Sequence, residues 1–485
     1  GFKALNEHLS KHLHAQQSFE NIAPPFNHAF IVYPFLTYKG WPLSDHEFIG
    51  VSIADLKQLV LSPYQKLPNK LVALHQVTFA NKIQFNTHRL LRAIDTNNLL
   101  SKLPITEQAK GNEMMLSRDE LLNAYAAYPH IIQNTENILA QCTVQFDYGK
   151  LKNKNKQFYT DSTANDMALL RSECIKGLSY RYTDANEKNL AHQRMEKELA
   201  VIEKMNFASY FLINWDIVNY ARSKQYYHVG RGSGANSLVA YLIGITDVDP
   251  LELDLYFERF INEQRSNAPD FDIDFSWRDR DDITRYIFER FGQNGKAALL
   301  GTYSTYQKDA VIQELGKVFG FPPNEIQQLK KIAPQYANIK KYKKDNLTEV
   351  LFYYAQHLAG KPSHLSIHAS GILISEEPIT YYSATSLPPK GYPTTQFSMI
   401  EAEDIGLFKF DILSQRGLGK IKDALAIIKQ NQGIDIDIHE IRKFKQDEKV
   451  KALLREGKAI GCFYVESPGM RRLLAKLRAD DYLRL

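Results

Sequence analysis

Pro269-Asp270-Phe271-Asp272-Ile273-Asp274-Phe275 is the stretch that decides the fold. Successive side chains of a β-strand point to opposite faces, so the three aspartates share one face and the apolar residues share the other. Carboxylates on such a face lie about 7 Å apart along the strand, and like charges that close are unfavourable unless a cation neutralises them. A pair of divalent ions bridged by carboxylates does this in phosphoryl-transfer centres. Mg²⁺ suits an all-oxygen set of ligands.

A solvated acidic edge strand, or a site for one calcium ion, would show the same alternation. Neighbouring motifs therefore matter, and the first of them is Val229-Gly230-Arg231-Gly232-Ser233-Gly234-Ala235-Asn236-Ser237. Glycines let the backbone approach a ligand closely. A helix expected just after this turn, over residues 238–242, would offer unpaired N–H groups to phosphates. Arg231 and Ser233 add a guanidinium fork and a hydroxyl donor. The turn is not a Walker A sequence, and an ordinary glycine-rich loop that caps a helix is the alternative.

The second motif is Phe408-Lys409-Phe410-Asp411-Ile412. Alternation places Lys409 beside Asp411 and opposite the aromatic pair. A plain surface salt bridge would account for the pair. The functional interpretation gives Asp411 to a metal and Lys409 to a triphosphate. Arg259 and Arg265 follow the glycine turn in the sequence, and each either counters phosphate charge or pairs with a neighbouring glutamate.

Length and composition set broad limits. The 485 residues suggest three domains, give or take one, and 44% apolar with 12% aromatic residues is typical of a globular protein. A net charge of +5 permits a nucleic-acid partner without arguing for one. Three widely spaced cysteines exclude a disulfide framework and a cysteine-rich zinc site, which fits a reducing cytoplasm. No apolar run reaches the roughly 18 residues that a membrane span needs.

Periodicity predicts the elements around these motifs. Strands are expected at residues 30–33 and 70–74, and a helix from Leu116 to Cys142 that is opened by the N-cap signal at Ser117. Residues 163–220 are expected to be mostly helical. Within them, one charged helix at residues 187–205 carries an apolar stripe of Leu190, Met195, Leu199 and Ile202. Residues 305–366 are predicted to be helical and residues 367–413 to return to strands.

The order of the motifs points to a family. Phe207-Ala208-Ser209-Tyr210-Phe211-Leu212-Ile213, Gly-Arg-Gly-Ser, residues 237–250, Phe257-Glu258-Arg259-Phe260, the acidic strand and Lys-Phe-Asp follow one another with near-family spacing. This series closely resembles the bacterial DNA polymerase III alpha subunits, the C-family replicative polymerases, over about residues 207–470. The resemblance implies an α+β multidomain fold. It consists of a polymerase-beta-like nucleotidyltransferase palm with a helical thumb insertion and a partial PHP (α/β) domain.

The resemblance also implies the residues of the site. Asp272, Asp274 and Asp411 correspond to the family's catalytic metal ligands, with Asp270 in a supporting role, and two Mg²⁺ ions are expected. One ion would activate a primer 3′-hydroxyl, and the other would hold the dNTP triphosphate and the leaving pyrophosphate. The expected triphosphate-binding residues are Arg231, Gly232, Ser233, Arg259, Arg265 and Lys409. His368, in Ser366-Ile367-His368-Ala369-Ser370-Gly371, is expected near the site without an assigned role.

The expected domains are a partial PHP domain at residues 1–141, the first part of the palm at 142–302 and the thumb at 303–366. The second part of the palm follows at 367–415 and the start of the fingers at 416–485. A lysine run in the thumb either neutralises duplex phosphates or is a solvated helix face. This run comprises Lys330, Lys331, Lys340, Lys341, Lys343 and Lys344. The implied partners are primer–template DNA, dNTPs, a sliding clamp and other replisome subunits, in the cytoplasm and without a membrane.

The partial PHP domain is expected to have lost its 3′–5′ exonuclease activity. Its opening His-x-His motif is missing, and Gln76 and Thr78 stand where metal-binding members carry charged or imidazole ligands. His8, His12 and His14 are interpreted as surface histidines. Because most of the fingers and the later domains are lacking, the chain alone is expected to polymerise poorly or not at all. A PHP-type phosphoesterase and a non-catalytic DNA-binding scaffold remain as alternatives, and the motifs do not separate a main replicase from an error-prone paralogue.

Overall fold

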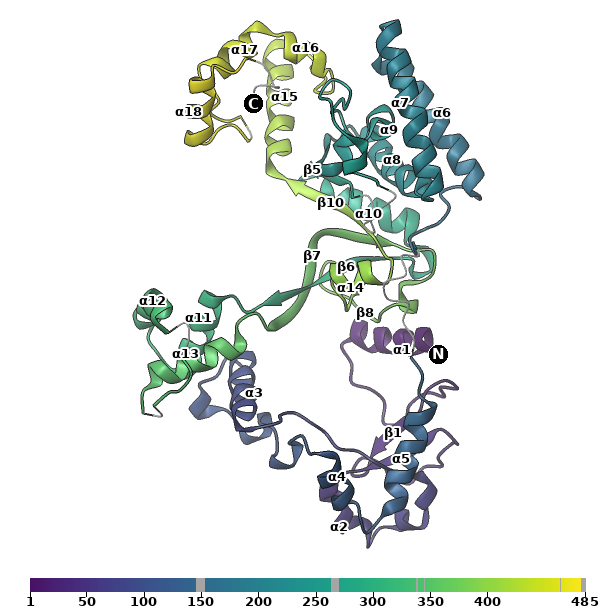
Figure 1. Ribbon diagram of the computed structural model, residues 1–485, viewed down its shortest axis with the longest axis vertical. Coiled ribbons are helices and arrows are strands. Elements are labelled where there is room, and N and C mark those ends of the chain that lie inside the picture. Colours follow the sequence, from purple (N-terminus) through teal and green to yellow (C-terminus); the bar gives the residue numbers. More distant parts are fainter. Residues whose placement is uncertain (145–152, 263–269, 337–338, 344, 463, 481–485) are drawn as a thin grey trace. The chain divides into compact units, whose positions relative to one another are not determined.

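The protein is described by a computed structural model that covers residues 1–144, 153–262, 270–336, 339–343, 345–462 and 464–480. The chain divides into two compact units, each built from two segments of sequence (Figure 1). Unit 1 comprises Gly1–Phe146 and Thr302–Ser366, and unit 2 comprises Asp147–Gly301 and Ile367–Leu485. The chain leaves unit 2 along strand β6 and returns to it along strand β7.

One part of unit 1 is a small parallel sheet with its own core. Its strands lie in the order β1-β2-β3; they are β1 Ile31–Pro34, β2 Glu47–Val51 and β3 Leu71–Ala73. The helices that contribute to its core are α2 Leu56–Leu59, α4 Arg118–Ala124 and α5 Pro129–Gln141; helix α1 Phe2–Ala15 precedes the sheet in the sequence. Tyr125 is fully buried and donates a hydrogen bond to the carbonyl of Val51 at 2.7 Å, which ties the helical segment to the central strand.

The strands predicted near residues 30–33 and 70–74 are confirmed, but the single helix predicted from Leu116 to Cys142 is wrong. Two helices, α4 and α5, take its place. Pro129 occupies the first turn of α5, where a missing N–H is tolerated, whereas inside a continuous helix it would break the backbone ladder. The predicted cap at Ser117 is confirmed, because Ser117 and Glu120 form a reciprocal capping box.

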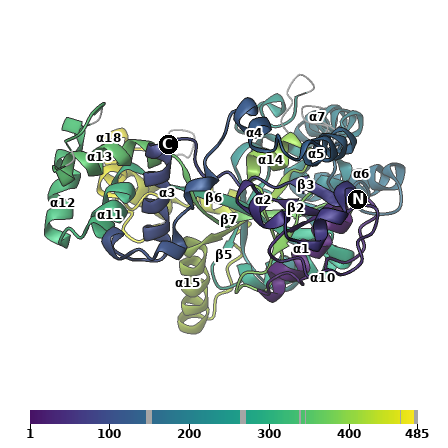
Figure 2. The ribbon, with the colours of Figure 1, turned by 90° about the horizontal axis from the view of Figure 1, so that it is seen from below.

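The other part of unit 1 is a helical cluster in which α3 Lys82–Asp95 packs with helices from residues 302–366 (Figure 2). Those helices are α11 Lys308–Phe319, α12 Pro323–Ile332 and α13 Leu347–Leu358. Leu90 of α3 is buried among Leu315 and Leu351, and Asn86 donates to the Tyr354 hydroxyl at 2.9 Å. The helical prediction for residues 305–366 is confirmed for α11, α12 and α13 and is wrong for residues 362–366, which already belong to β7.

Unit 2 is organised around a mixed seven-stranded sheet in the order β4-β5-β10-β7-β6-β9-β8. The strands are β4 His228–Arg231, β5 Asp272–Ser276, β6 Ala297–Thr305, β7 Pro362–Ile374, β8 Thr385–Ser386, β9 Thr394–Thr395 and β10 Lys409–Gln415. Strand β10 runs parallel to β5 on one side and antiparallel to β7 on the other, and β4 runs antiparallel to β5. The mixed α and β content matches the α+β expectation.

Helices from residues 163–291 share the main core of unit 2 with this sheet (Figure 1). They are α6 Thr163–Arg181, α7 Ala185–Lys204, α8 Ala208–Ser223, α9 Leu238–Leu242 and α10 Arg280–Phe291. The predicted apolar stripe of α7 is confirmed for Met195, Leu199 and Ile202, which are fully buried. It is wrong for Leu190, which is 57% exposed, because at 3.6 residues per turn Leu190 points about 140° away from Met195; the fully buried Ala191 takes its place on the stripe.

The remaining helices of unit 2 are α14 Met399–Asp404, α15 Arg416–Gln432, α16 Ile441–Gln446, α17 Glu448–Arg455 and α18 Pro468–Leu477. Helix α15 continues directly from β10, so the strand that carries Lys409 and Asp411 also sets the direction in which this helix begins. Among the described residues, no helix combines the length and the apolar character needed to cross a membrane.

Candidate active site

The acidic strand, β5, and the Lys-Phe-Asp strand, β10, are neighbours in the sheet of unit 2. Their parallel register sets Asp411 directly opposite Asp272. Asp270 immediately precedes β5, and it joins Asp272 and Asp411 in a group whose ligand oxygens all lie within 4.8 Å of one another. Ile273 and Phe410 point to the other face and are fully buried. The alternation read from the sequence therefore places the acids on one face and the core residues on the opposite face.

Asp274 has a different environment from the other acids. Its carboxylate is almost fully buried and accepts a hydrogen bond from Arg231 Nε at 2.8 Å and one from Gln415 Nε2 at 3.4 Å. Arg231 also reaches Asp272 Oδ2 through Nη1 at 2.9 Å. The structure thus brings Asp272 and Asp411 together as the sequence predicts. Asp270 is the third member of the ligand group, whereas Asp274 is held by Arg231.

Two cationic side chains neutralise part of the acidic charge. Lys409 Nζ lies 2.7 Å from Asp270 Oδ2 and also forms an ion pair with Asp411. Burial lowers the pKa of Lys409, but the two ion pairs outweigh burial and the pKa is raised overall. Burial raises the pKa of Asp270 and of Asp272, while Lys409 and Arg231 respectively oppose that rise.

The donor set fits a divalent metal ion. All its ligand atoms are carboxylate oxygens, which hard cations prefer. Asp270 Oδ1 is buried and accepts no hydrogen bond from any residue that the structure describes. An orphaned buried acceptor is costly unless it meets a cation or a donor. Ser370 donates to Asp411 Oδ1 at 2.6 Å and thereby fixes the orientation of that carboxylate.

Tyr210 of α8 supports both acidic strands from the core side. Its ring stacks on Phe271 at 5.6 Å between centroids and lies 4.8 Å from the Phe410 centroid. Its hydroxyl accepts a hydrogen bond from the Phe271 N–H at 3.3 Å. Phe271 and Phe410 neighbour Asp272 and Asp411 in the chain, so this aromatic stack sets the spacing of the acids on the other face.

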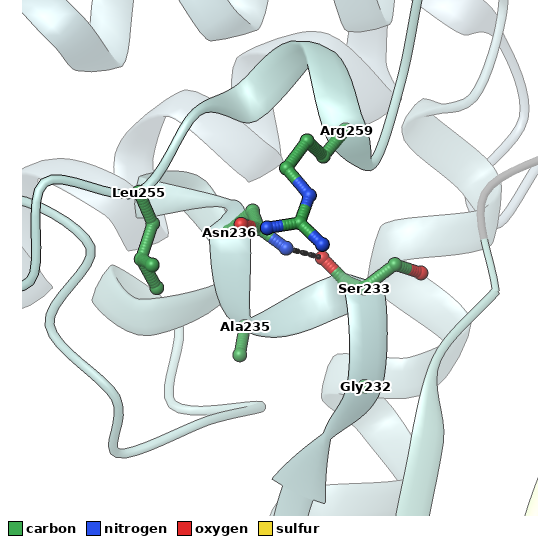
Figure 3. A pocket seen from close by; sticks show the side chains of 6 residues that line it. All are labelled: Gly232, Ser233, Ala235, Asn236, Leu255 and Arg259. Carbon is green, nitrogen blue, oxygen red and sulfur yellow. Dashed lines mark hydrogen bonds between the residues drawn. The ribbon is translucent and has the colours of Figure 1, made fainter.

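The glycine turn adjoins the acids and borders a pocket. Strand β4 ends at Arg231, and residues Gly232–Asn236 form a 3-10 helix, η7. Gly232 has φ of 74°, and a Cβ there would lie 2.9 Å from Asp272 Oδ2, so glycine is required on both counts. The adjacent pocket has a volume of about 400 Å³ and is lined by Gly232, Ser233, Ala235, Asn236, Leu255 and Arg259 (Figure 3).

Arg259 extends its guanidinium toward the turn in Figure 3, where Asn236 Nδ2 donates to the Ser233 carbonyl at 2.8 Å. Arg259 belongs to a second short 3-10 helix, η8 Phe257–Arg259. The turn and η8 thus form two walls of one pocket, with a cationic side chain between them. Arg265, which the sequence also nominated for phosphate binding, lies outside the described residues.

The prediction that the helix after the turn offers unpaired N–H groups to phosphates is wrong. The Leu238 and Val239 N–H groups donate to the buried carboxylate of Glu198, each at 3.1 Å. The Ala240 N–H donates to Ser237 Oγ, also at 3.1 Å. Short helix α9 is therefore capped from within the protein. Any phosphate contact at this turn must come from residues 231–236 and from Arg259.

The other nominated residues fall into two groups. His368 lies near the acids, and its Nδ1 accepts the Gly371 N–H at 2.9 Å; burial lowers its pKa, and Asp411 opposes that effect. Within residues 303–366, Lys330 donates to Gln313 at 2.8 Å, while Lys331, Lys340, Lys341 and Lys343 are exposed. Lys344 lies outside the described residues.

In the segment at residues 74–78, His75 contacts the Met114 carbonyl at 2.9 Å. Gln76 and Thr78 instead donate to Glu113, at 3.4 and 2.6 Å. At the N-terminus the interpretation of His12 as a surface histidine is wrong, because its side chain is enclosed by His8 and Phe19 and the residue is only 8% exposed.

Sequence reasoning missed Arg194 and Glu198. The guanidinium of Arg194 and the carboxylate of Glu198 hold the glycine turn in place. Their i,i+4 spacing on a predicted helix indicates an ion pair. Nothing in that spacing indicates which residues the pair faces. Ser370 lies in the motif at residues 366–371, but its hydrogen bond to Asp411 depends on the pairing of β7 with β10.

Comparisons with known proteins agree with this geometry. Residues 168–414 match the family described as bacterial DNA polymerase III alpha NTPase domain, and residues 417–484 match the bacterial DNA polymerase III alpha subunit finger domain. The chain is 32% identical to the DNA polymerase III subunit alpha of Halalkalibacterium halodurans, over 91% of this chain and 41% of that protein. It is 33% identical to the Bacillus subtilis subunit, over 89% of this chain and 39% of that protein.

An error-prone DNA polymerase from Symbiobacterium thermophilum is 30% identical, over 85% of this chain and 38% of that protein. The chain therefore spans about two fifths of the length of these curated relatives.

Proposed function

Because the chain belongs to the bacterial DNA polymerase III alpha family, we propose that it carries the nucleotidyl-transfer centre of a template-directed DNA polymerase. Its substrates are primer–template DNA and dNTPs. The observation that carries the proposal is the register of Asp272 against Asp411, with Asp270 beside them and the Gly232 turn in contact with Asp272. A scaffold that only bound DNA would gain nothing from clustered acids next to phosphates.

Asp270, Asp272 and Asp411 would hold Mg²⁺ in this proposal, with Asp274 as a further acid at the edge of the group. Two bound ions would supply the charge that activates a primer 3′-hydroxyl and stabilises the leaving pyrophosphate. The protein's own contribution is positioning and electrostatic stabilisation, which dominate phosphoryl transfer. Ser370 and Tyr210 fix the two strands, so the carboxylates need little rearrangement when the substrate arrives.

Arg231 and Lys409 each have two kinds of partner in this proposal: the aspartates and the triphosphate. Without a metal ion they neutralise the acids. Metal binding would take over those carboxylates and release both cations toward the triphosphate. With Gly232, Ser233 and Arg259 lining the pocket, they form the triphosphate-binding set. Arg265 remains part of the proposal on sequence grounds alone.

Primer extension tests the proposal. The chain is placed in excess over primer–template in Mn²⁺, and single-turnover incorporation is compared between wild type, Asp411→Asn and Asp423→Asn. Asp423 is a half-exposed aspartate of α15 paired with Arg278 and serves as the control. We expect slow incorporation by wild type and Asp423→Asn, and a loss of about a hundredfold or more in Asp411→Asn. Equal incorporation by all three proteins would contradict the proposal.

Several wider assignments belong to the same proposal. Residues 142–302 and 367–415 would form the palm, residues 303–366 the thumb and residues 416–485 the start of the fingers. Residues 1–141 would be a partial PHP domain without 3′–5′ exonuclease activity, since Gln76 and Thr78 bind Glu113. The thumb lysines, Lys330 to Lys344, would meet the DNA backbone. A sliding clamp and other replisome subunits in the cytoplasm are the proposed partners.

A further inference from the structure

One helix of unit 2 holds both walls of the pocket that adjoins the acids. Arg194 and Glu198 lie one turn apart on α7 and form an ion pair, Nε to Oε1, at 2.7 Å. The carboxylate of Glu198 has no exposed surface, and Arg194 is only 20% exposed. A buried charge pair of this kind is costly to break, since either partner alone would remain uncompensated.

Glu198 ties α7 to the end of the glycine turn. It accepts three hydrogen bonds there: from Ser237 Oγ at 2.9 Å and from the Leu238 and Val239 N–H groups at 3.1 Å. With Arg194 Nε, its carboxylate has four donors. The position of the segment that follows η7 is therefore fixed by a residue that lies outside the pocket.

Arg194 joins the two walls to each other. Its Nη2 donates to the Asn236 carbonyl at 3.3 Å and to the Leu255 carbonyl at 3.0 Å. Asn236 ends the turn, and Leu255 leads into η8, which carries Arg259; both line the pocket. One guanidinium nitrogen thus bridges the backbone of both walls, while its Nε is held by Glu198.

We propose that Arg194 and Glu198 are positioning residues for the nucleotide: they set the distance between the Gly232–Asn236 turn and Arg259, and thereby the affinity of the pocket for a triphosphate. The inference rests on the proposed function of this pocket. It extends that function to a pair that touches neither the substrate nor the metal ligands. Lysine cannot replace Arg194, because a single ammonium group lacks the fork that reaches Glu198 and two carbonyls together.

The test measures the affinity of the chain for inorganic triphosphate and for dATP by calorimetry in Mn²⁺, well below the unfolding temperature. Arg194→Lys is the main variant and Glu198→Gln the second. Glu198→Gln keeps the size of the side chain but loses the charge. Arg171→Lys is the matched control: Arg171 of α6 also pairs with a glutamate of α7, Glu196, whereas its described hydrogen bonds do not include the turn.

We expect Arg194→Lys and Glu198→Gln to weaken both ligands about tenfold, the loss that removing charged hydrogen bonds of this kind implies. Arg171→Lys should bind like wild type, and the Mn²⁺ affinity of all four proteins should agree within twofold. Unchanged triphosphate affinity in folded Arg194→Lys would overturn the inference, even if that variant unfolds at a lower temperature. Absence of triphosphate binding by wild type would instead overturn the assignment of the pocket itself.

Discussion

Arg231 and Lys409 each contact two aspartates, and these contacts explain how four carboxylates can lie in so small a space. When all four acids are ionised, two cations leave two negative charges uncompensated. That remainder favours a divalent ion over a further ion pair. Asp270 Oδ1 is buried and accepts no hydrogen bond from a described residue, so part of the uncompensated charge lies at this atom.

His228 provides a pH-dependent prediction. Burial lowers the pKa of His228 from 6.5 to about 3, assisted by Arg222 and His439 and opposed by Asp247. Because the folded pKa lies below the unfolded one, the unfolded chain binds the extra proton. The stability that the folded state gains while His228 is neutral is therefore fully present above pH 6.5 and is lost as the pH falls toward 3. The expected slope is about 1.4 kcal/mol per pH unit within that window.

His228→Phe removes this titration and keeps a ring of similar size. The Gly244 carbonyl, which His228 contacts at 3.1 Å, still accepts from Arg222 at 2.9 Å. Denaturant unfolding of both proteins between pH 7.5 and 4.5 measures the difference. Wild type should lose stability more steeply below pH 6.5 than the variant, and parallel curves would show that His228 does not titrate as described.

At the scale of elements, Asn155 fixes the start of β10. Its side chain donates to the Phe408 carbonyl at 2.7 Å and accepts the Phe408 N–H at 2.8 Å, next to Lys409. Asn155→Ala leaves both backbone groups buried without these partners. We expect a loss of about 2–4 kcal/mol in the free energy of unfolding, measured by denaturant titration. Asn186→Ala, at an exposed position of α7, should change it by less than about 0.5 kcal/mol. Similar losses in both variants would refute this role.

The sequence predicts these elements where a local rule applies and fails where a long-range contact decides. Strand alternation correctly placed Asp272 and Asp411 on polar faces with Phe410 in the core. It had no means of choosing between Asp270 and Asp274 as the third acid, because that depends on where Arg231 of β4 reaches. The capping of α9 by Glu198 could not be predicted either, because Glu198 and Leu238, whose N–H it accepts, lie 40 residues apart in the sequence.

At the scale of the molecule, the chain has separate cores in its two units, and in each unit a core joins segments that are distant in the sequence. Leu90 of α3 packs with residues of α11 and α13 inside unit 1. Leu170 of α6 belongs to the core that supports the acidic strands in unit 2. Sequence order alone assigned residues 1–141 and 303–366 to different domains. The contact of α3 with α11 and α13 arises from tertiary packing that no local pattern indicates.

Leu90→Ala and Leu170→Ala should therefore act on different units. Each removes a buried side chain, and each should cost about 2–5 kcal/mol of local stability. Hydrogen exchange followed by mass spectrometry locates the loss. Leu90→Ala should reduce protection in α3, α11 and α13, and Leu170→Ala in α6, α8 and α9. Loss of protection confined to α3 in Leu90→Ala would contradict the shared core of unit 1.

The central claim is that Asp270, Asp272 and Asp411 act together as a divalent-metal site. Titration of the chain with Mn²⁺, followed by electron paramagnetic resonance of the free ion, tests it directly in wild type, Asp272→Asn and Asp281→Asn. Asp281 is a control aspartate whose side chain is 91% exposed. We expect Asp272→Asn to weaken Mn²⁺ binding by about tenfold or more and Asp281→Asn to leave it unchanged. Equal Mn²⁺ affinity in wild type and Asp272→Asn would contradict it.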